Sequence, residues 1–215
     1  MQAKHDLRYL DLLLCAIMII PMALTIMIFA LLIKLTTNHS AFFIQKRIGL
    51  NGAIINVVKL RTMYEQEKTN CLGRFLRRFG LDELPQACWN IPRGEMSFFG
   101  PRPLPLEEAG ANIVSGRTCR RSGIINIFSA IAGPAKGHQP TELHYYFEDF
   151  ELQHWSKLWI AKLILALIHS LLWRKNMAAR LRFFGFDQQL LELLKETTNR
   201  TPGDNHGISS MPILP

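Results

Sequence analysis

The sequence predicts an α+β protein that is mostly helical and carries a membrane-embedded helix near its N-terminus. Leu12–Ile33 is a run of 22 residues without a charge, long enough to cross a bilayer core of about 30 Å. Two apolar runs, Ala41–Gln45 and Ile54–Val58, flank the pair Asn51-Gly52, so we expect a β-hairpin there. Helices are expected at residues 72–80, 86–92, 155–173 and 176–196.

The composition limits the classes of partner. The 215 residues are 48% hydrophobic, which is ample for a core, and 25 Lys and Arg against 17 Asp and Glu give a net charge of +8. A basic chain suits nucleic acid, anionic lipid or phosphorylated metabolites. Nucleic-acid binding is disfavoured, because acids are interleaved with the basic residues and no binding module is recognisable. The four cysteines lack C-x-x-C spacing, which favours reduced thiols over a disulfide or zinc framework.

The apolar run leaves two membrane topologies open. It is longer than the hydrophobic region of a cleaved signal peptide, about 7–15 residues. Pro21 near its middle removes one backbone hydrogen bond and kinks the helix, which a spanning helix tolerates. Lys4 and Arg8 precede the run and Lys34 follows it. Because positive flanks tend to stay in the cytoplasm, we favour a re-entrant helix that bends at Pro21 and anchors the chain through residues 1–38.

The second strand of the hairpin ends with two cations. Lys59 and Arg61 are two residues apart, so their side chains would point to the same face of the sheet. Such a pair suits the binding of a phosphate group. A solvated sheet edge, where lysine is also favoured, is the alternative.

The strongest chemical signal is the acidic pair Asp82-Glu83. It follows the predicted helix 72–80, whose Arg74, Arg77 and Arg78 share one face. Carboxylates flanked by fixed cations suit phosphoryl chemistry, in which an acid attacks phosphorus or binds a metal and guanidinium groups neutralise phosphate oxygens. A surface ion-pair network is one alternative. Helix capping by Asp82, with Pro85 in the first turn, is another.

The segment Gly100-Pro101-Arg102-Pro103 is expected to be rigid and extended, because a residue before proline avoids the helical region. It would present Arg102 to an anion, although a plain turn explains the pattern nearly as well. Further along, Arg117, Arg120 and Arg121 add positive charge, and residues 133–140 form a predicted loop.

The C-terminal part contains two predicted helices. Residues 155–173 have aromatic ends and bear Lys157 and Lys162, which suits a helix lying in the headgroup plane; a buried core helix is the alternative. Residues 39–176 are expected to form one catalytic domain that includes this helix. Residues 177–215 would add a weakly amphipathic helix and a disordered tail from Thr197.

The order of motifs in the first half of the chain is highly specific. These motifs are Phe42-Phe43-x-Gln45-x-Arg47-x-Gly49-x-x-Gly52, Lys59-x-Arg61-Thr62-Met63, Gly73-Arg74-Phe75-Leu76-Arg77-Arg78, Leu81-Asp82-Glu83-Leu84-Pro85-Gln86, and Gly94-Glu95-Met96-Ser97 with Gly100-Pro101-Arg102-Pro103. In this order they resemble the bacterial sugar transferases, or monotopic phosphoglycosyl transferases. The resemblance covers residues 4–106, and residues 155–172 match the family's closing interfacial helix more loosely.

The resemblance implies a reaction. A sugar 1-phosphate would pass from a UDP-sugar to a polyprenyl phosphate such as undecaprenyl phosphate, with release of UMP, to initiate exopolysaccharide, O-antigen or glycoprotein synthesis. Asp82 would be the nucleophile, forming a phosphosugar-enzyme intermediate that the polyprenyl phosphate then attacks. Glu83 would assist with proton handling, or with Mg²⁺ held by Asp82 and Glu83. Candidate phosphate and nucleotide contacts are Lys59, Arg61, Arg77 and Arg102.

The resemblance also implies a location. The helix at Leu12–Ile33 would be re-entrant in the bacterial inner membrane, with the small catalytic domain and its interfacial amphipathic helices on the cytoplasmic face. Membrane lipids and a second copy of the chain, forming a homodimer, are the further partners expected.

Several positions differ from the family pattern. Ile20 replaces a serine before the helix proline, Ser40-Ala41 replaces Gly-Pro, and Glu95 replaces aspartate. The family's Pro-Gly-Ile-Thr-Gly segment is Ser122–Asn126 here, with Ser129 where glutamine is expected and Ala161 where the last helix has aspartate. These differences concern sugar recognition. A catalytically lapsed family member, acting as a membrane scaffold or lipid-binding protein, is the alternative function.

Overall fold

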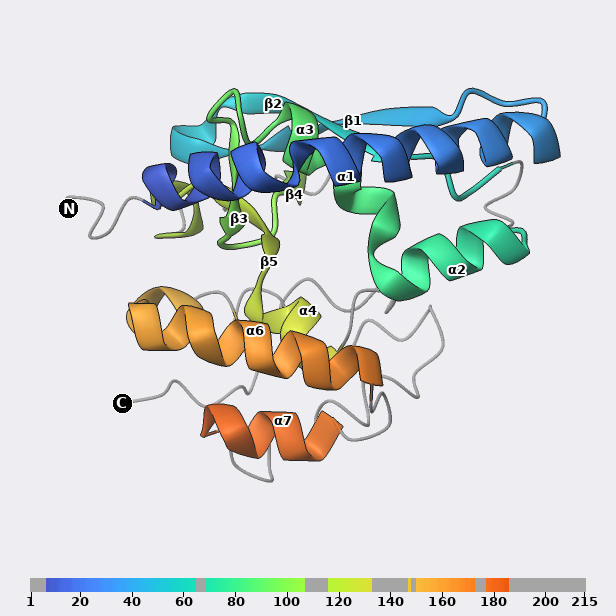
Figure 1. The fold of residues 1–215 in the computed structure, drawn as a ribbon. Helices are drawn as coiled ribbons and strands as arrows, with labels where there is room; N and C mark the ends of the chain where they lie inside the picture. Colours follow the sequence, from blue (N-terminus) through green and yellow to red (C-terminus); the bar gives the residue numbers. More distant parts are fainter. Residues whose placement is uncertain are drawn as a thin grey trace, which may run out of the picture.

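The computed structural model describes residues 7–64, 69–106, 116–132, 147, 150–172 and 177–185. The described part is α+β and mostly helical, as predicted. Figure 1 shows α1, the hairpin β1–β2, α2 and α3 on one side of the molecule, and α4, α6 and α7 gathered on the other. The helices are α1 (Arg8–Thr36), α2 (Cys71–Phe79), α3 (Leu84–Trp89), α4 (Ile127–Ala132), α6 (Lys157–Leu172) and α7 (Met177–Phe184). The strands are β1 (Phe42–Ile48), β2 (Ile54–Leu60), β3 (Met96–Phe99), β4 (Leu104–Pro105) and β5 (Ser122–Ile125).

Helix α1 is uninterrupted from Arg8 to Thr36, with Pro21 inside it. The predicted bend therefore does not break the helix. Proline removes only one intrahelical donor, and the helix continues on both sides of it. Among the described residues, α1 is the one helix long and apolar enough to cross a membrane.

One face of α1 packs on the rest of the protein along its whole length. Cys15 and Met22 join a core with residues of β2, β3 and α3, and Ile26 and Ile33 join a second core with Leu60 and Leu76. The opposite face exposes large apolar side chains, among them Leu13, Ile17, Ile20, Leu24, Met27, Ile28, Leu31 and Leu35. Both ends of the apolar helix are therefore fixed to the same body.

The N-terminal end of α1 is held by a buried carboxylate. Asp11 is 1% exposed and accepts hydrogen bonds from the Ser97 hydroxyl and the Phe98 backbone N–H, each at 3.0 Å. A buried carboxylate is tolerated only when it is hydrogen-bonded, so this contact fixes α1 against β3.

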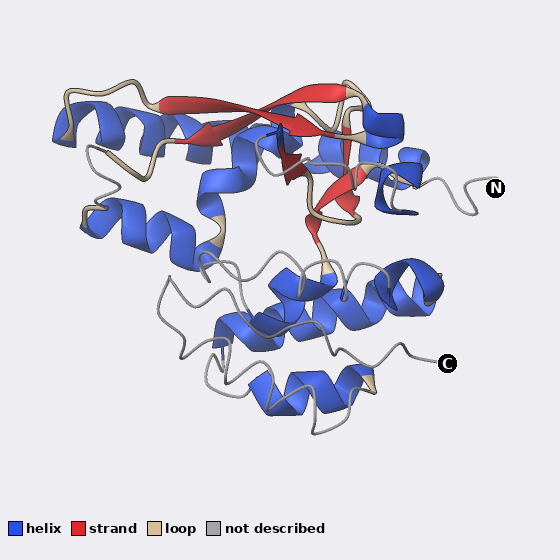
Figure 2. Ribbon diagram, turned by 180° about the vertical axis from the view of Figure 1, so that it is seen from behind, coloured by secondary structure: helices blue, strands red, loops and turns tan. Residues whose placement is uncertain are grey.

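The predicted hairpin is confirmed. Strands β1 and β2 pair antiparallel from Phe42↔Leu60 to Ile48↔Ile54, and Figure 2 shows them running alongside α1. Asn51 and Gly52 in the turn have φ of 54° and 78°, a left-handed conformation that these two residue types tolerate best. Strand β4 extends the sheet at the other edge of β1 through Ile48↔Leu104.

A second, parallel pair of strands brings two distant segments together. Strand β3 pairs with β5 from Met96↔Ser122 to Phe99↔Ile125. A Cβ at Gly123 would lie 2.1 Å from the backbone nitrogen of Gly100, so a side chain there would force the two segments apart. This close approach places residues 123–126 beside the Arg102 segment.

The remaining helices share a core of their own. Ile127, Phe128 and Ile131 of α4 pack with Trp159 and Leu163 of α6, and with Leu181 and Phe184 of α7. Helix α6 also exposes Leu158, Leu165, Ile168 and Leu172. Helix α6, predicted as residues 155–173, therefore has one face in the core and another apolar face that is exposed. The first face agrees with the core-helix alternative, and the position of the second in a headgroup plane stays a prediction. The helix predicted over 176–196 is wrong in its length: α7 ends at Phe184, because Gly185 takes a left-handed φ of 87°. The predicted loop 133–140 and the tail from Thr197 lie outside the described residues.

Replacing Asp11 with alanine should lower the free energy of unfolding by about 1–3 kcal/mol, because the N–H of Phe98 and the hydroxyl of Ser97 lose their shared acceptor. Thermal unfolding of the detergent-solubilised protein measures this. Ser97→Ala is the comparison variant: it keeps the Phe98 N–H bond to Asp11, and it removes the Ser97 bond to Asp11 together with the Phe99 N–H bond to Ser97 Oγ at 3.3 Å. An unchanged unfolding temperature for Asp11→Ala would contradict the packing of α1 on β3.

Candidate functional site

The acidic pair lies at a bend between two helices. Helix α2 ends at Phe79 and is capped by Gly80. The left-handed φ of 69° at Gly80 lets its N–H donate to the carbonyls of Leu76 and Arg77. A single 3₁₀ turn, Leu81–Glu83, follows, and α3 begins at Leu84 with Pro85 in its first turn. The prediction of a helix at 72–80 is thus right to within one residue.

Asp82 does not cap a helix. The N-cap positions of the 3₁₀ turn and of α3 belong to Gly80 and Glu83, and neither makes a side-chain capping bond. The capping interpretation of Asp82 is therefore wrong. Its carboxylate is half-buried and is not used to stabilise a helix end.

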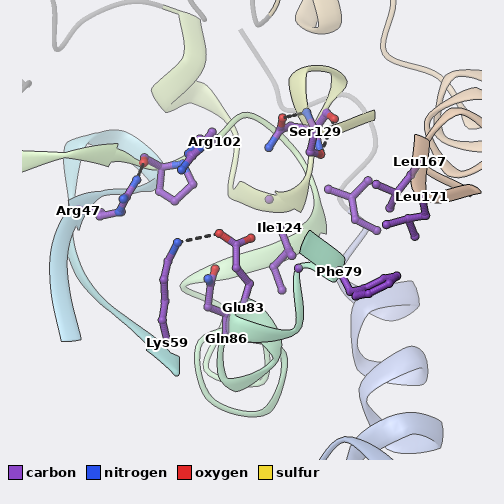
Figure 3. Close-up of a pocket in the computed structure, with 15 residues that line it drawn as sticks. Arg47, Lys59, Phe79, Glu83, Gln86, Arg102, Ile124, Ser129, Leu167 and Leu171 are labelled. Carbon is purple, nitrogen blue, oxygen red and sulfur yellow. Dashed lines mark hydrogen bonds and ion pairs between the residues drawn. The ribbon is translucent and has the colours of Figure 1, made fainter. Parts of the chain in front are cut away.

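Glu83 forms an ion pair with Lys59 of β2. The Lys59 Nζ lies 2.7 Å from Glu83 Oε1, and the two side chains are 15% and 27% exposed. Both side chains are therefore largely shielded from solvent. Lys59 does not lie at a solvated sheet edge, and its ion pair with Glu83 is not an exposed surface pair. Figure 3 shows the two side chains meeting at the wall of a cavity.

The cavity has a volume of about 120 Å³ and two kinds of wall. One side is charged and polar, built by Arg47, Lys59, Glu83, Gln86 and Arg102. The other side is apolar and includes Phe79, Ile124, Leu167 and Leu171, the last two from α6 (Figure 3). An amphipathic ligand with an anionic group would match both walls.

The two carboxyl groups differ in their acidity. Burial and, after it, the charge of neighbouring Glu83 raise the pKa of Asp82 to about 6, although Lys59 and Arg77 oppose the shift. Burial on its own would also raise the pKa of Glu83, but Lys59 and then Arg102 hold it below its ordinary value. Glu83 is thus ionised at neutral pH, while Asp82 exchanges its proton close to neutrality.

The structure brings together most of the predicted site residues. Lys59, Glu83 and Arg102 line the cavity. Asp82 adjoins Glu83 and feels the charges of Lys59 and Arg77, but it is not among the residues that form the cavity wall.

Arg61 is placed elsewhere. Strand β2 ends at Leu60, so Arg61 and Lys59 do not converge as the two-residue spacing predicted. The Arg61 guanidinium donates to the carbonyl of Ser40 at 2.9 Å and to that of Phe42 at 3.3 Å, and it lies over the Phe43 ring. It does not line the cavity.

Sequence reasoning missed four residues with polar side chains in the cavity wall. Arg47 is 7% exposed and donates to the Pro103 carbonyl and to Gln45 Oε1, which fixes the segment that carries Arg102. The Gln45-x-Arg47 motif was the available signal. Gln86, Asn126 and Ser129 also line the cavity, and Asn126 and Ser129 belong to the segment that departs from the family pattern.

Asn126 and Ser129 bond mainly to each other. The Ser129 N–H donates to Asn126 Oδ1 at 2.9 Å, and the Asn126 N–H donates to Ser129 Oγ at 3.1 Å. This reciprocal arrangement opens α4 in the manner of a capping box. The departure at position 129 is therefore accommodated by the local fold at the edge of the cavity.

An acid pair of opposed acidity beside a cationic cavity suits a transferase that acts on phosphorylated substrates. The chain belongs to the bacterial sugar transferase family: the sequence model of that family matches residues 6–173. The resemblance found in the motifs is confirmed, and the match extends well beyond residue 106. The chain is accordingly a sugar transferase.

Two relatives illustrate the similarity. The UDP-glucose:undecaprenyl-phosphate glucose-1-phosphate transferase of Caulobacter vibrioides is 32% identical over 190 residues, which are 79% of this chain and 70% of that protein. The undecaprenyl-phosphate glucose phosphotransferase of Komagataeibacter xylinus is 34% identical over 122 residues, which are 50% of this chain and 23% of that protein.

A third relative is the exopolysaccharide production protein ExoY of Sinorhizobium fredii. It is 32% identical over 129 residues, covering 47% of this chain and 57% of that protein. The matched region is thus under a quarter of the Komagataeibacter protein and a little over half of ExoY, while it is most of the Caulobacter protein.

Replacing Asp82 with asparagine should raise the unfolding temperature at pH 7.5. The folded state raises the pKa of Asp82 from 3.8 to about 6, so ionisation above that pH destabilises the fold. After a discount for partial exposure, the gain should be about 1–2 kcal/mol. It should vanish only below about pH 3, under the unfolded pKa of 3.8, where the carboxyl is neutral in both states.

Glu83→Gln is the matched control. The pKa of Glu83 is lowered in the folded protein, so its charge is stabilising at neutral pH and its removal should lower the unfolding temperature. Thermal unfolding at pH 7.5 and at about pH 3 measures both variants. A lower unfolding temperature for Asp82→Asn at pH 7.5 would contradict the electrostatics described.

Proposed function

We propose that this chain transfers a sugar 1-phosphate from a UDP-sugar to a polyprenyl phosphate, giving a polyprenyl-diphosphate sugar and UMP. The observation that carries the proposal is the acid pair Asp82-Glu83, held among Lys59, Arg77 and Arg102 beside a cavity with one apolar wall. The names of the Caulobacter and Komagataeibacter relatives point to undecaprenyl phosphate as the acceptor. The product would initiate a cell-surface glycan, and the name ExoY favours an exopolysaccharide.

The reaction would proceed in two displacements at one phosphorus. An Asp82 carboxylate oxygen attacks the β-phosphorus of the UDP-sugar, the bond from that phosphorus to the bridging oxygen breaks, and UMP leaves with the electron pair. The product is a phosphosugar bound to Asp82 as an acyl phosphate, a mixed anhydride. A phosphate oxygen of the polyprenyl phosphate then attacks the same phosphorus, and the Asp82 carboxylate is released unchanged. A covalent intermediate divides one difficult transfer into two easier steps.

The charges around the pair support this assignment. Asp82 is the residue whose pKa lies near neutrality, so it is largely ionised above pH 6 yet poorly stabilised as an anion, which favours attack on phosphorus. Lys59, Arg77 and Arg102 would neutralise the oxygens of the diphosphate. Glu83 keeps Lys59 oriented through their 2.7 Å contact.

The pair also fits a magnesium ion. Mg²⁺ is bound in enzymes by one or two carboxylates together with substrate phosphates and water, and Asp82 and Glu83 are adjacent. No group of three or more His, Cys, Asp and Glu side chains that could hold a metal is found in the described part of the chain, so the substrate would have to complete the coordination. When bound, Mg²⁺ would offset the charge of the diphosphate.

The apolar features suit a lipid acceptor. The cavity wall formed by Phe79, Leu167 and Leu171 adjoins the cationic side, and α1 and α6 both expose apolar faces. A polyprenyl phosphate carries an anionic head on a hydrocarbon chain, so one cavity would accept both parts. The reaction would take place at the headgroup plane of the membrane.

The packing of α1 supports a topology in which both of its ends lie on the same side of the membrane. A helix that crossed the bilayer would separate its two ends by about 30 Å of hydrocarbon. Here Asp11 near one end of α1 bonds to Ser97, and Ile33 near the other end packs in a core with Leu60 and Leu76. Both ends therefore contact the part of the protein that carries the candidate site. We therefore propose that both ends lie on the cytoplasmic face of the inner membrane and that the exposed side of α1 enters the lipid.

Asp82→Asn should abolish transfer while Arg61→Gln retains it to within a few-fold, because Asp82 is the proposed nucleophile next to Glu83 of the cavity wall, whereas Arg61 is bound to the carbonyls of Ser40 and Phe42. The measurement is UMP release and lipid product from membrane fractions given undecaprenyl phosphate and UDP-glucose or other UDP-sugars. Undiminished product from Asp82→Asn would show that Asp82 is not the nucleophile. An inactive wild-type protein across the whole panel of UDP-sugars would favour the scaffold alternative.

The topology is tested by single cysteines at residues 5 and 38, in a variant whose exposed Cys71 and Cys119 are replaced by serine. A membrane-impermeant thiol reagent applied to intact cells should label neither position, and both should react after lysis. Labelling of residue 5 in intact cells, with residue 38 protected, would show that α1 spans the bilayer.

A further inference from the structure

The side-chain amide of Gln86 is buried at the cavity wall without a hydrogen-bond partner. Gln86 lies in α3, is 2% exposed and lines the cavity. Its Nε2 has no acceptor, and the described residues offer no hydrogen bond to its Oε1 either. A buried N–H group without an acceptor is unfavourable. A ligand bound in the cavity would provide the missing hydrogen-bond partner.

The backbone that carries this amide is fixed. The Gln86 carbonyl accepts from the N–H groups of Asn90 and Ile91 at 2.9 and 3.0 Å, which holds its backbone in the helix. Gln86 follows Glu83 by three residues, so the two side chains lie on the same side of the chain. Figure 3 shows Gln86 next to Glu83 and near Lys59.

A second buried amide on the same segment provides the contrast. Asn90 is fully buried, and its Nδ2 donates to the Asn56 carbonyl at 2.8 Å and to Glu95 Oε2 at 2.7 Å, while its Oδ1 accepts from the Val58 N–H at 3.3 Å. Asn90 thus joins β2 to the loop before β3. Gln86 makes no such connection, so its amide has no comparable structural role.

We propose that Gln86 binds a hydroxyl group of the sugar that is transferred, an assignment that rests on the function proposed above. A neutral amide offers one donor group and one acceptor, as a hydroxyl does, whereas phosphate oxygens accept only and are matched here by Lys59 and Arg102. The sugar is attached directly to the phosphorus that Asp82 attacks. The uridine lies one phosphate further away, so a group three residues from Glu83 reaches the sugar first.

The test combines Gln86→Met with donor analogues. Methionine has nearly the same shape and cannot make these hydrogen bonds. For the wild-type protein, removing the hydroxyl that Gln86 binds should lower kcat/KM for UMP release by about 10-fold, the effect of one neutral hydrogen bond. Gln86→Met should show the same loss with the parent UDP-sugar. It should show no further loss with the deoxy analogue.

Stability provides an independent readout. Gln86→Met should unfold at the same or a higher temperature than the wild type in the absence of donor, because an unpaired buried amide is removed. Asn90→Leu, the matched control, should unfold at a lower temperature. A clear loss of stability in Gln86→Met would overturn the proposal, since the amide would then have a partner within the fold.

The outcomes separate the two proposals. If Gln86→Met keeps the wild-type penalty for every single-deoxy donor, the Gln86 assignment is wrong while the transfer reaction stands. If the wild-type protein releases no UMP from any UDP-sugar, the proposed reaction is wrong and the sugar assignment is refuted with it.

Discussion

The ion pair between Lys59 and Glu83 is the interaction on which the site depends. Two adjacent carboxylates cannot both remain ionised in a half-buried site unless a cation offsets one of them. Lys59 supplies that cation at 2.7 Å from Glu83. This requires β2 to lie beside the bend between α2 and α3, and Asn90, which bonds to both neighbours of Val57 in that strand, maintains this arrangement. The hairpin, the helix pair and the divided acidity of the two carboxyl groups are therefore parts of one structure.

The same body carries the membrane-facing features. Helix α1 contributes Cys15, Met22, Ile26 and Ile33 to the two cores that support β2 and α3, so the anchor is packed with the site rather than attached by a linker. Helix α6 has a comparable double role: Leu163 lies in a core while Leu167 and Leu171 reach the cavity. Apolar surface and reaction site are consequently held at a fixed distance, as a reaction between a soluble donor and a lipid would require.

Local patterns predicted much of this arrangement. Asn51-Gly52 predicted the hairpin, the arginines before Gly80 the helix α2, and the motif order the family and the acid pair. The failures concern tertiary structure. Lys59 and Arg61 were expected to point to the same face because they are two residues apart. That rule holds only within a strand, and β2 ends at Leu60, one residue before Arg61. Capping by Asp82 failed because the 3₁₀ turn shifts the cap position to Glu83. Gln86 could not be recognised, because an unpaired amide is a property of its surroundings.

The central claim is that Asp82, the less acidic member of the pair, bears the phosphosugar. Its most direct test is to mix the protein with a UDP-sugar that it uses, omit the lipid acceptor, quench, digest and locate the added mass by tandem mass spectrometry. The account predicts one phosphosugar on the Asp82 side chain. A modification on Glu83 or any other residue, or stoichiometric UMP release with no adduct at all, would contradict it.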